Sequence, residues 1–316
     1  MDTLFDELRE RISGEVRFDK ASKILYSTDA SIYQIEPIGV VIPKRREDVV
    51  ETIKIANRHK VPVLPRGGGT SLGGQTVGEA IIIDMSKYLN KIIEINQEEQ
   101  WVRAEPGIVL DELNAQLRPY GLLFAPDVST STHANIGGMI GNNSAGSRSL
   151  VYGKTVDHIK ELRVVLSNGE ETTFREINLE EAFSKGQGND FESRIYREIR
   201  RIASANKEEI LKRYPKINRR VSGYNLDEFV KEGGTFNMAR MVVGSEGTLA
   251  TVVEAKINLV PRPKMSALDI IHFESVFDAM DASAEILECN PVAIEMMDKM
   301  ILDLTKSSPE YSRKRT

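Results

Sequence analysis

The sequence predicts a soluble α+β protein of about two domains. Short apolar runs typical of strands alternate with amphipathic helical stretches along the chain. Asn168-Gly169 lies between two strand-like runs, which is a strong signal for a β-hairpin. The 316 residues leave room for about two domains of roughly 150 residues each. With 41% hydrophobic and 28% charged residues, the chain can build a buried core.

Composition argues against several classes of protein. Lys and Arg number 42 against 47 Asp and Glu, and a net charge of −5 argues against nucleic-acid binding. No apolar run approaches the ~20 residues of a membrane helix, and the stretch 1–11 lacks the apolar core of a secretory signal. We therefore expect a cytoplasmic protein, either in solution or peripheral at the inner membrane. Cys289 is the only cysteine, so no internal disulfide and no iron–sulfur cluster held by this chain's thiolates are expected.

The chain begins with an expected helical leader over residues 1–33. Leu4, Leu8 and Ile12 share one face of its first helix. We interpret this helix as an ordinary packing helix, because its other face is not basic enough for a membrane surface.

An α/β unit follows the leader, and its strand–helix–strand order predicts a parallel pair of strands with a right-handed crossover. Its elements are a strand over 39–43, a helix over 47–59 and a strand over 61–65. Further strands are expected over 80–85, 91–96, 101–105, 158–166, 170–174 and 248–261, and a helix over 109–120. Gly121 suits the C-terminal end of that helix. The charged segment 178–215 predicts the helices of a surface insertion.

The C-terminal segment begins a new unit at Met265. A strand near 268–273 and a helix over 276–287 are expected there. This unit is too small to bury its own apolar faces, so we expect it to open a second domain that is cut off.

A glycine-rich segment from Pro65 to Gln75 is the strongest local signal. Its three consecutive glycines, 67–69, permit positive φ angles and leave no Cβ to block a ligand, so backbone N–H groups can converge on a phosphate. The segment fits neither common nucleotide motif. Leu72 stands where the dinucleotide fingerprint needs glycine, and Gln75 stands where the P-loop needs lysine. A plain glycine-rich turn is the alternative.

Small residues dominate a second segment, from Pro126 to Gly153. Glycine buries little apolar area and costs backbone entropy, so a core would not favour this composition. We interpret the segment as a backbone surface for a large flat ligand, with a mobile loop as the alternative. A third segment, Gly244 to Leu249, resembles a serine-nucleophile elbow only superficially, because Val243 stands where that motif needs glycine.

Together the three segments resemble the FAD-linked oxidases with a PCMH-type (vanillyl-alcohol oxidase-like) FAD-binding domain. The matching stretches are 65–75 for the pyrophosphate loop, 136–155 for the second FAD segment, and 244–249 with 260–263 for the last. The resemblance spans about residues 34–300 and points to the glycolate oxidase flavin subunit and D-lactate dehydrogenase branch. Ser222 to Asp227 is similar to a segment of the branch's large members, which add iron–sulfur domains after the flavin part.

The resemblance implies a two-subdomain FAD-binding domain over 34–263. The subdomains, 34–96 and 97–263, would hold FAD between them, and a helical insertion would occupy about 176–238. Residues 264–316 would open a ferredoxin-like substrate cap domain.

The resemblance also implies FAD-binding roles for residues of all three segments. The backbone of 66–71 would hold the pyrophosphate, and the second segment would line the flavin and its ribityl chain. Thr70 stands where some relatives carry a histidine bonded to the flavin, so non-covalent FAD is expected. The candidate residues are Pro65, Arg66, Gly67, Gly68, Gly69, Thr70, Ser71, Gly74, Gln75, Pro126, Asp127, Thr130, Ile136, Gly137, Gly138, Gly141, Asn142, Ser144, Ala145, Gly146, Tyr152, Gly153, Glu246 and Gly247.

The activity implied by the resemblance is oxidation of a 2-hydroxy acid of the D-lactate or glycolate type. Flavin N5 would take hydride from the substrate's α-carbon, and electrons would pass to an iron–sulfur or quinone-linked acceptor outside this chain. No catalytic residue is assigned. Of the four histidines only His133 lies in a candidate segment, and their spacing matches no zinc motif. A cell-wall-precursor-type FAD reductase and a flavin-binding subunit without its own catalysis stay open as alternatives.

Overall fold

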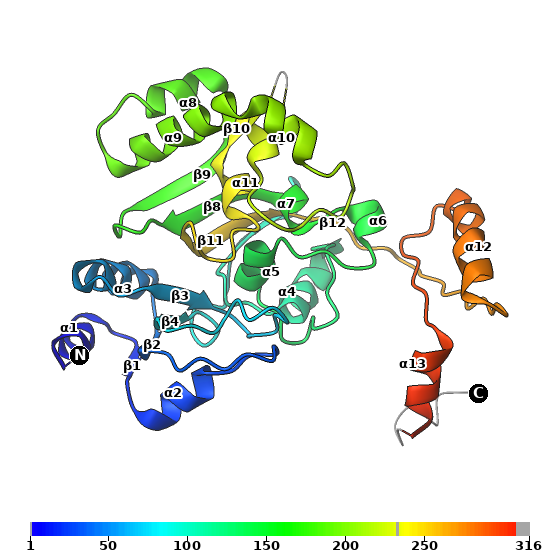
Figure 1. The fold of residues 1–316 in the computed structure, drawn as a ribbon, viewed down its shortest axis with the longest axis horizontal. Coiled ribbons are helices and arrows are strands. Elements are labelled where there is room, and N and C mark those ends of the chain that lie inside the picture. The colour runs from blue at the N-terminus through cyan, green and yellow to red at the C-terminus, as the bar shows by residue number, and fades with distance from the viewer. Residues whose placement is uncertain (1, 232–233, 308–316) are drawn as a thin grey trace.

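The computed structural model describes residues 2–231 and 234–307. Two β-sheets and their covering helices make up the body of the molecule (Figure 1). The smaller sheet lies with the N-terminal helices, and the larger sheet lies with the helices that follow residue 178. The mixed α+β class predicted from the sequence is confirmed.

The smaller sheet has four strands in the order β1 (Glu15–Arg17), β2 (Gly39–Ile42), β4 (Ile81–Asp84) and β3 (Val63–Arg66). β2 and β3 both run parallel to β4, while β1 is antiparallel to β2. The predicted strand pair over 39–43 and 61–65 is therefore parallel but not adjacent, because β4 lies between the two. The isoleucines of β4 are fully buried, as expected for the centre of a parallel sheet covered on both faces.

Helices α1 (Asp2–Arg11) and α3 (Arg46–His59) pack against each other beside this sheet. Leu4, Leu8 and Ile12 are buried in a cluster with residues of β2, α3 and β4, which confirms the packing-helix interpretation. The leader differs from the wholly helical one expected, because β1 joins the sheet before α2 (Lys20–Tyr26) begins.

The larger sheet is antiparallel throughout, in the order β10-β9-β8-β11-β6-β5. Its strands are β5 (Ile92–Asn96), β6 (Trp101–Ala104), β8 (Ile159–Val165), β9 (Glu171–Ile177), β10 (Phe236–Asn237) and β11 (Thr251–Asn258). The hairpin predicted at Asn168-Gly169 joins β8 to β9. Helix α4 (Leu110–Leu117), extended by the 3-10 turn η1 (Arg118–Tyr120), ends at Gly121 in the left-handed conformation, as predicted.

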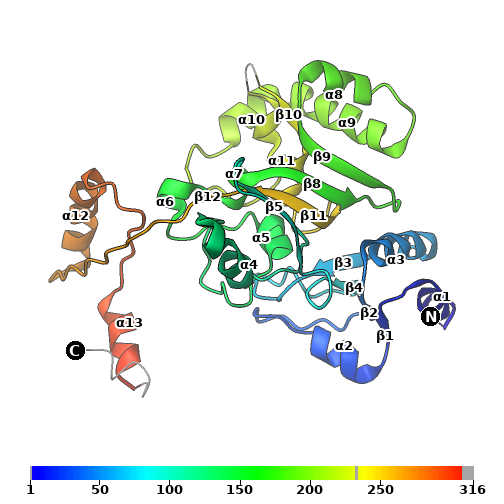
Figure 2. The same cartoon turned by 180° about the vertical axis from the view of Figure 1, so that it is seen from behind.

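The predicted helical insertion covers the β9–β10 end of the larger sheet (Figure 2). It contains α8 (Leu179–Lys185), α9 (Phe191–Ala205), α10 (Lys207–Arg213) and the 3-10 turn η2 (Leu226–Phe229), and α11 (Met238–Val242) follows β10. Tyr196 of α9 is almost fully buried and packs its ring against Phe174 and Phe236, which attaches the insertion to the sheet.

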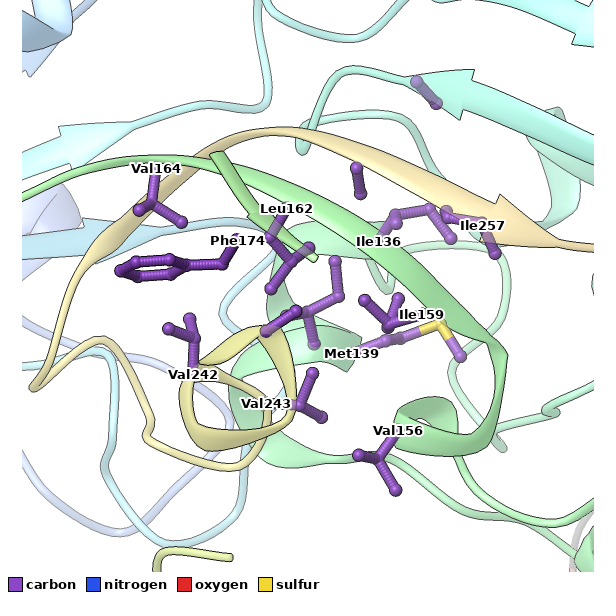
Figure 3. Close-up of a cluster of buried hydrophobic side chains, with 14 of the residues drawn as sticks. Ile136, Met139, Val156, Ile159, Leu162, Val164, Phe174, Val242, Val243 and Ile257 are labelled. Carbon is purple, nitrogen blue, oxygen red and sulfur yellow. The ribbon is translucent and has the colours of Figure 1, made fainter. Parts of the chain in front are cut away.

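The glycine-rich second segment contains three short helices rather than a continuous loop. They are α5 (Ile136–Asn142), α6 (Ser149–Tyr152) and α7 (Thr155–His158). Ile136 and Met139 of α5 lie among the buried side chains of β8, β11 and α11 (Figure 3). This burial explains why a segment of low helix propensity is helical, because tertiary packing overrides propensity.

The C-terminal elements stand apart from the body in both views (Figures 1 and 2). After β12 (Val260–Pro261), which pairs with β7 (Leu122–Leu123), residues 264–275 form no helix or strand. The strand predicted near 268–273 is therefore wrong. Within the described residues no strand pairs with this stretch, and Leu268 is 86% exposed. The helix predicted over 276–287 is confirmed as α12 (Val276–Glu288), followed by α13 (Lys299–Leu304) and the turn η3 (Thr305–Ser307).

Candidate cofactor-binding site

The first two predicted segments line one cavity of about 1190 Å³. A second, narrow pocket of about 80 Å³ shares part of its lining and lies between the glycine loop, α5 and the third segment. Backbone and small side chains form most of both linings. The residues common to the two are Gly67, Ser71, Gln75, Thr76, Gly138 and Asn142. Such a surface admits a large ligand close to the main chain.

The glycine loop, residues 67–75, begins where β3 ends. Gly69 has φ +65°, in the left-handed region that side chains rarely adopt. The Arg66 guanidinium faces backbone carbonyl groups. It donates to the backbone oxygens of Tyr26, Thr28 and Thr76 at 2.8–3.1 Å. Burial lowers the pKa of Arg66, although nearby acidic groups oppose this effect, so the group stays charged.

Helix α5 presents two different faces. Ile136, Met139 and Ile140 are buried in the core, so the prediction that Ile136 lies at the cofactor is not supported by its position. Gly138 is exposed on the cavity side, and a Cβ added there would have no heavy atom within 4 Å. Gly137 is different, because a Cβ there would lie 2.7 Å from a side-chain carbon of Pro106.

Hydrogen bonds join the three segments to one another. Asn142 Nδ2 donates to Ser71 Oγ at 2.8 Å, which links α5 to the glycine loop. Gln75 Nε2 donates to Glu246 Oε1 at 3.3 Å, which links that loop to the third segment. The amide of Glu246 donates to the oxygen of Gly141 at 3.0 Å. Residues 71 to 171 positions apart in the sequence are therefore joined in one continuous lining.

Asp127 organises the far end of the second segment. Its carboxylate accepts hydrogen bonds from Ser147 Oγ at 3.0 Å and from the amide of Arg148 at 3.1 Å. A Cβ on Gly146 would lie 2.2 Å from the Asp127 backbone oxygen, so this turn needs glycine. Asp127 thereby fixes the shape of the cavity wall.

Most of the candidate residues line the cavity or the narrow pocket. The five that line neither are Gly74, Pro126, Ile136, Tyr152 and Gly153. His133, the one histidine in a candidate segment, also lines neither, and its Nδ1 is 2.8 Å from Thr132 Oγ1. Among the described residues, no group of acidic, histidine or cysteine side chains could hold a metal ion.

Several lining residues were not predicted from the sequence. Ala30 comes from the leader, Asn135 precedes α5, Arg219 follows the insertion helices and Ser245 lies in the third segment. Ser245 lies in the third segment directly before the predicted Glu246 and could have been included on that ground. Ala30 and Arg219 carry no local signal, because only the tertiary fold brings them to the cavity.

Three buried polar atoms of the lining have no hydrogen-bond partner: Asn135 Oδ1, Gln75 Oε1 and Ser245 Oγ. Buried polar atoms are nearly always hydrogen-bonded, and an unpartnered one needs an explanation. A ligand that brings hydrogen-bonding groups into the cavity would supply the missing partners.

The comparisons with known proteins agree with this geometry. Residues 37–175 match a protein family described as "FAD binding domain". D-2-hydroxyglutarate dehydrogenase of Pantoea ananatis is 38% identical over 298 residues, which cover 93% of this chain and 29% of that protein. Glycolate oxidase subunit GlcD of Bacillus subtilis is 29% identical over 298 residues, covering 92% and 53% respectively. The chain thus spans about 30% of the first relative and about half of the second.

Among solved structures, an alkyldihydroxyacetonephosphate synthase superposes with a TM-score of 0.65 at 19% identity, over 93% of this chain and 47% of that one. This likeness supports the fold alone. In the described part of the chain, no helix is long and apolar enough to cross a membrane.

Proposed function

We propose that this chain is the flavin-binding part of a dehydrogenase that oxidises a 2-hydroxy acid. Its residues 37–175 match the FAD-binding domain family. The observation that carries the proposal is the convergence of the three glycine-rich segments on two adjoining hollows. The first two segments line the cavity of about 1190 Å³, and the third lines the narrow pocket that shares part of that lining. Similarity to D-2-hydroxyglutarate dehydrogenases and to a glycolate oxidase subunit supports the substrate class.

The residues present fit FAD. Gly138 leaves open space where a side chain would otherwise stand, and the three unpartnered polar atoms lie in the linings of the cavity and pocket. When bound, FAD supplies the acceptor for the two electrons removed from the substrate.

The chain's own residues would bind and orient the cofactor. The backbone of 66–71 would hold the diphosphate through N–H groups, as anion-binding concavities of successive amides do. Thr130, Gly138 and Asn142 would lie along the flavin and its ribityl chain, and Glu246 would close the pocket at the third segment. Thr70 has no ring nitrogen with which to form a covalent link, so the FAD is held without one.

No histidine lines the cavity within the described residues, and its charged side chains are Asp127, Arg219 and Glu295. Asp127 is committed to the 147–148 turn. We therefore leave the catalytic base unassigned.

Residues 264–316 would begin a substrate cap domain, in keeping with the exposed apolar side chains of the described part of this segment. Met265, Phe277 and Met300 are each more than two-thirds exposed. Such a surface is typical of an interface rather than of free solvent contact. An iron–sulfur or quinone-linked acceptor would take the electrons.

The test is anaerobic bleaching of bound flavin near 450 nm by D-2-hydroxyglutarate, D-lactate and glycolate, with NADPH as the competing reductant. It is run on the 316-residue chain and, as a full-length reference, on the D-2-hydroxyglutarate dehydrogenase of Pantoea ananatis. We expect both proteins to bind FAD. At least one 2-hydroxy acid should bleach the reference, and the 316-residue chain should respond far more slowly because it holds only the beginning of the proposed cap domain that would position the substrate. Bleaching by NADPH but by none of the three acids would contradict the proposal.

A further inference from the structure

The loop after α2, residues 27–33, is hydrogen-bonded to the glycine loop. It precedes residue 37, where the match to the FAD-binding family begins. The amide of Ala30 donates to the oxygen of Gly69 at 2.9 Å. Ala30 also lines the main cavity, so this leader loop reaches the site itself.

Two charged side chains fasten the leader loop to the two ends of the glycine loop. Asp29 Oδ2 accepts hydrogen bonds from Thr76 Oγ1 at 2.8 Å and from the Thr76 amide at 3.4 Å. Arg66 donates from the other end to the backbone oxygens of Tyr26 and Thr28 at 3.1 and 2.8 Å. The glycine loop is thus held at its entry, at its middle and at its exit.

These contacts supply the conformational restraint that the glycine loop itself lacks. Glycine is the most flexible residue, so a run of three has no local preference for the conformation that aims its amides at an anion. The loop carries no lysine or arginine after Arg66, and the Arg66 guanidinium is turned to carbonyl groups of the leader loop. The conformation of the glycine loop therefore has to be fixed by contacts with neighbouring segments such as the leader loop.

We propose that the leader loop is a structural part of the FAD site, with Asp29 and Arg66 as positioning residues that hold the glycine loop ready for the diphosphate. This inference rests on the proposed FAD binding. Neither side chain needs to touch the cofactor, because each acts through the backbone of residues 67–76.

The test compares Asp29→Ala, Asp29→Asn and a control, Glu36→Gln, in the flavin-free chain. Glu36 also carries a carboxylate on the segment after α2, but it pairs at 3.6 Å with Lys23 and is largely exposed. FAD is titrated by fluorescence at a temperature well below unfolding. We expect the Kd to rise at least tenfold in Asp29→Ala and by a smaller factor in Asp29→Asn, whose side chain keeps an acceptor oxygen. Glu36→Gln should stay within twofold of the parent.

Limited trypsin digestion supplies a readout that general destabilisation would not give. Cleavage at the Arg66–Gly67 bond should become faster in Asp29→Ala while other tryptic sites keep their rates, and saturating FAD should suppress the difference. A Kd for Asp29→Ala within twofold of the parent, or uniformly faster digestion, would overturn the inference. If the parent chain itself bound no FAD, the proposed function would fail instead, so the two failures are distinguishable.

Discussion

Replacement of Gly138 by alanine should weaken FAD binding without lowering the stability of the flavin-free protein. The added methyl group would meet no atom within 4 Å in the flavin-free protein. Alanine is favoured over glycine in helices by up to about 1 kcal/mol. We therefore expect the thermal midpoint of the flavin-free variant to be unchanged or raised by no more than ~3 °C.

The same methyl group would occupy space that we assign to the cofactor. Adding a carbon to a close-packed contact typically costs about 1–3 kcal/mol, which corresponds to a ~5- to ~150-fold rise in the Kd for FAD. Gly137→Ala is the matched comparison one residue away. Its Cβ would lie 2.7 Å from Pro106, so this variant should lose stability even without FAD.

The assay is thermal unfolding of both flavin-free variants, followed by fluorescence titration with FAD. If Gly138→Ala bound FAD as tightly as the parent, the cavity beside α5 would not be the cofactor site. A fall of several degrees in its midpoint without FAD would show that Gly138 does not face open space.

Three further results are expected. Gly68→Val should abolish FAD retention, because its Cβ would lie 2.3 Å from the backbone oxygen of His133 and would displace the glycine loop from the turn that precedes α5. Retention of FAD through gel filtration would contradict this. Acid precipitation should release all the flavin, since Thr70 offers no linkage, and coloured precipitate would refute it. Hydrogen bonds from Lys87 and Tyr88, aided by Arg17, lower the Glu15 pKa from 4.5 to about 2. The stabilisation by Glu15 is then complete above pH 4.5 and lost as pH falls toward 2. Solvent screening limits it to ~1 kcal/mol, so the difference in thermal midpoint between parent and Glu15→Gln should shrink between pH 6 and pH 3, and a constant difference would contradict the assignment.

Local signals in the sequence were sufficient for most individual elements. The apolar period of α1, the Asn168-Gly169 turn and the left-handed Gly121 each depend on a few neighbouring residues, and each was predicted. The order of the strands within each sheet was harder to predict. Nothing local shows that β4 lies between β2 and β3, because strand order depends on contacts between distant residues.

Tertiary contacts override local composition at two places. The glycines around α5 left a mobile loop open as an alternative, yet burial of Ile136 and Met139 makes this stretch helical. The apolar run at 268–273 suggested a strand, yet no described strand pairs with it.

The candidate site was predictable only in part, for the same reason. The three glycine-rich segments stand out by composition, and they converge as expected. The contribution of the leader loop did not stand out, because Asp29 and Ala30 are ordinary residues until the fold places them against Gly69 and Thr76.

Titration of the flavin-free chain with FAD and with FMN tests the central claim most directly. The account predicts saturable binding of one FAD per chain, with at least tenfold weaker binding of FMN, because FMN lacks the diphosphate that the glycine loop would hold. Absence of saturable FAD binding, or equal affinity for FMN, would contradict it.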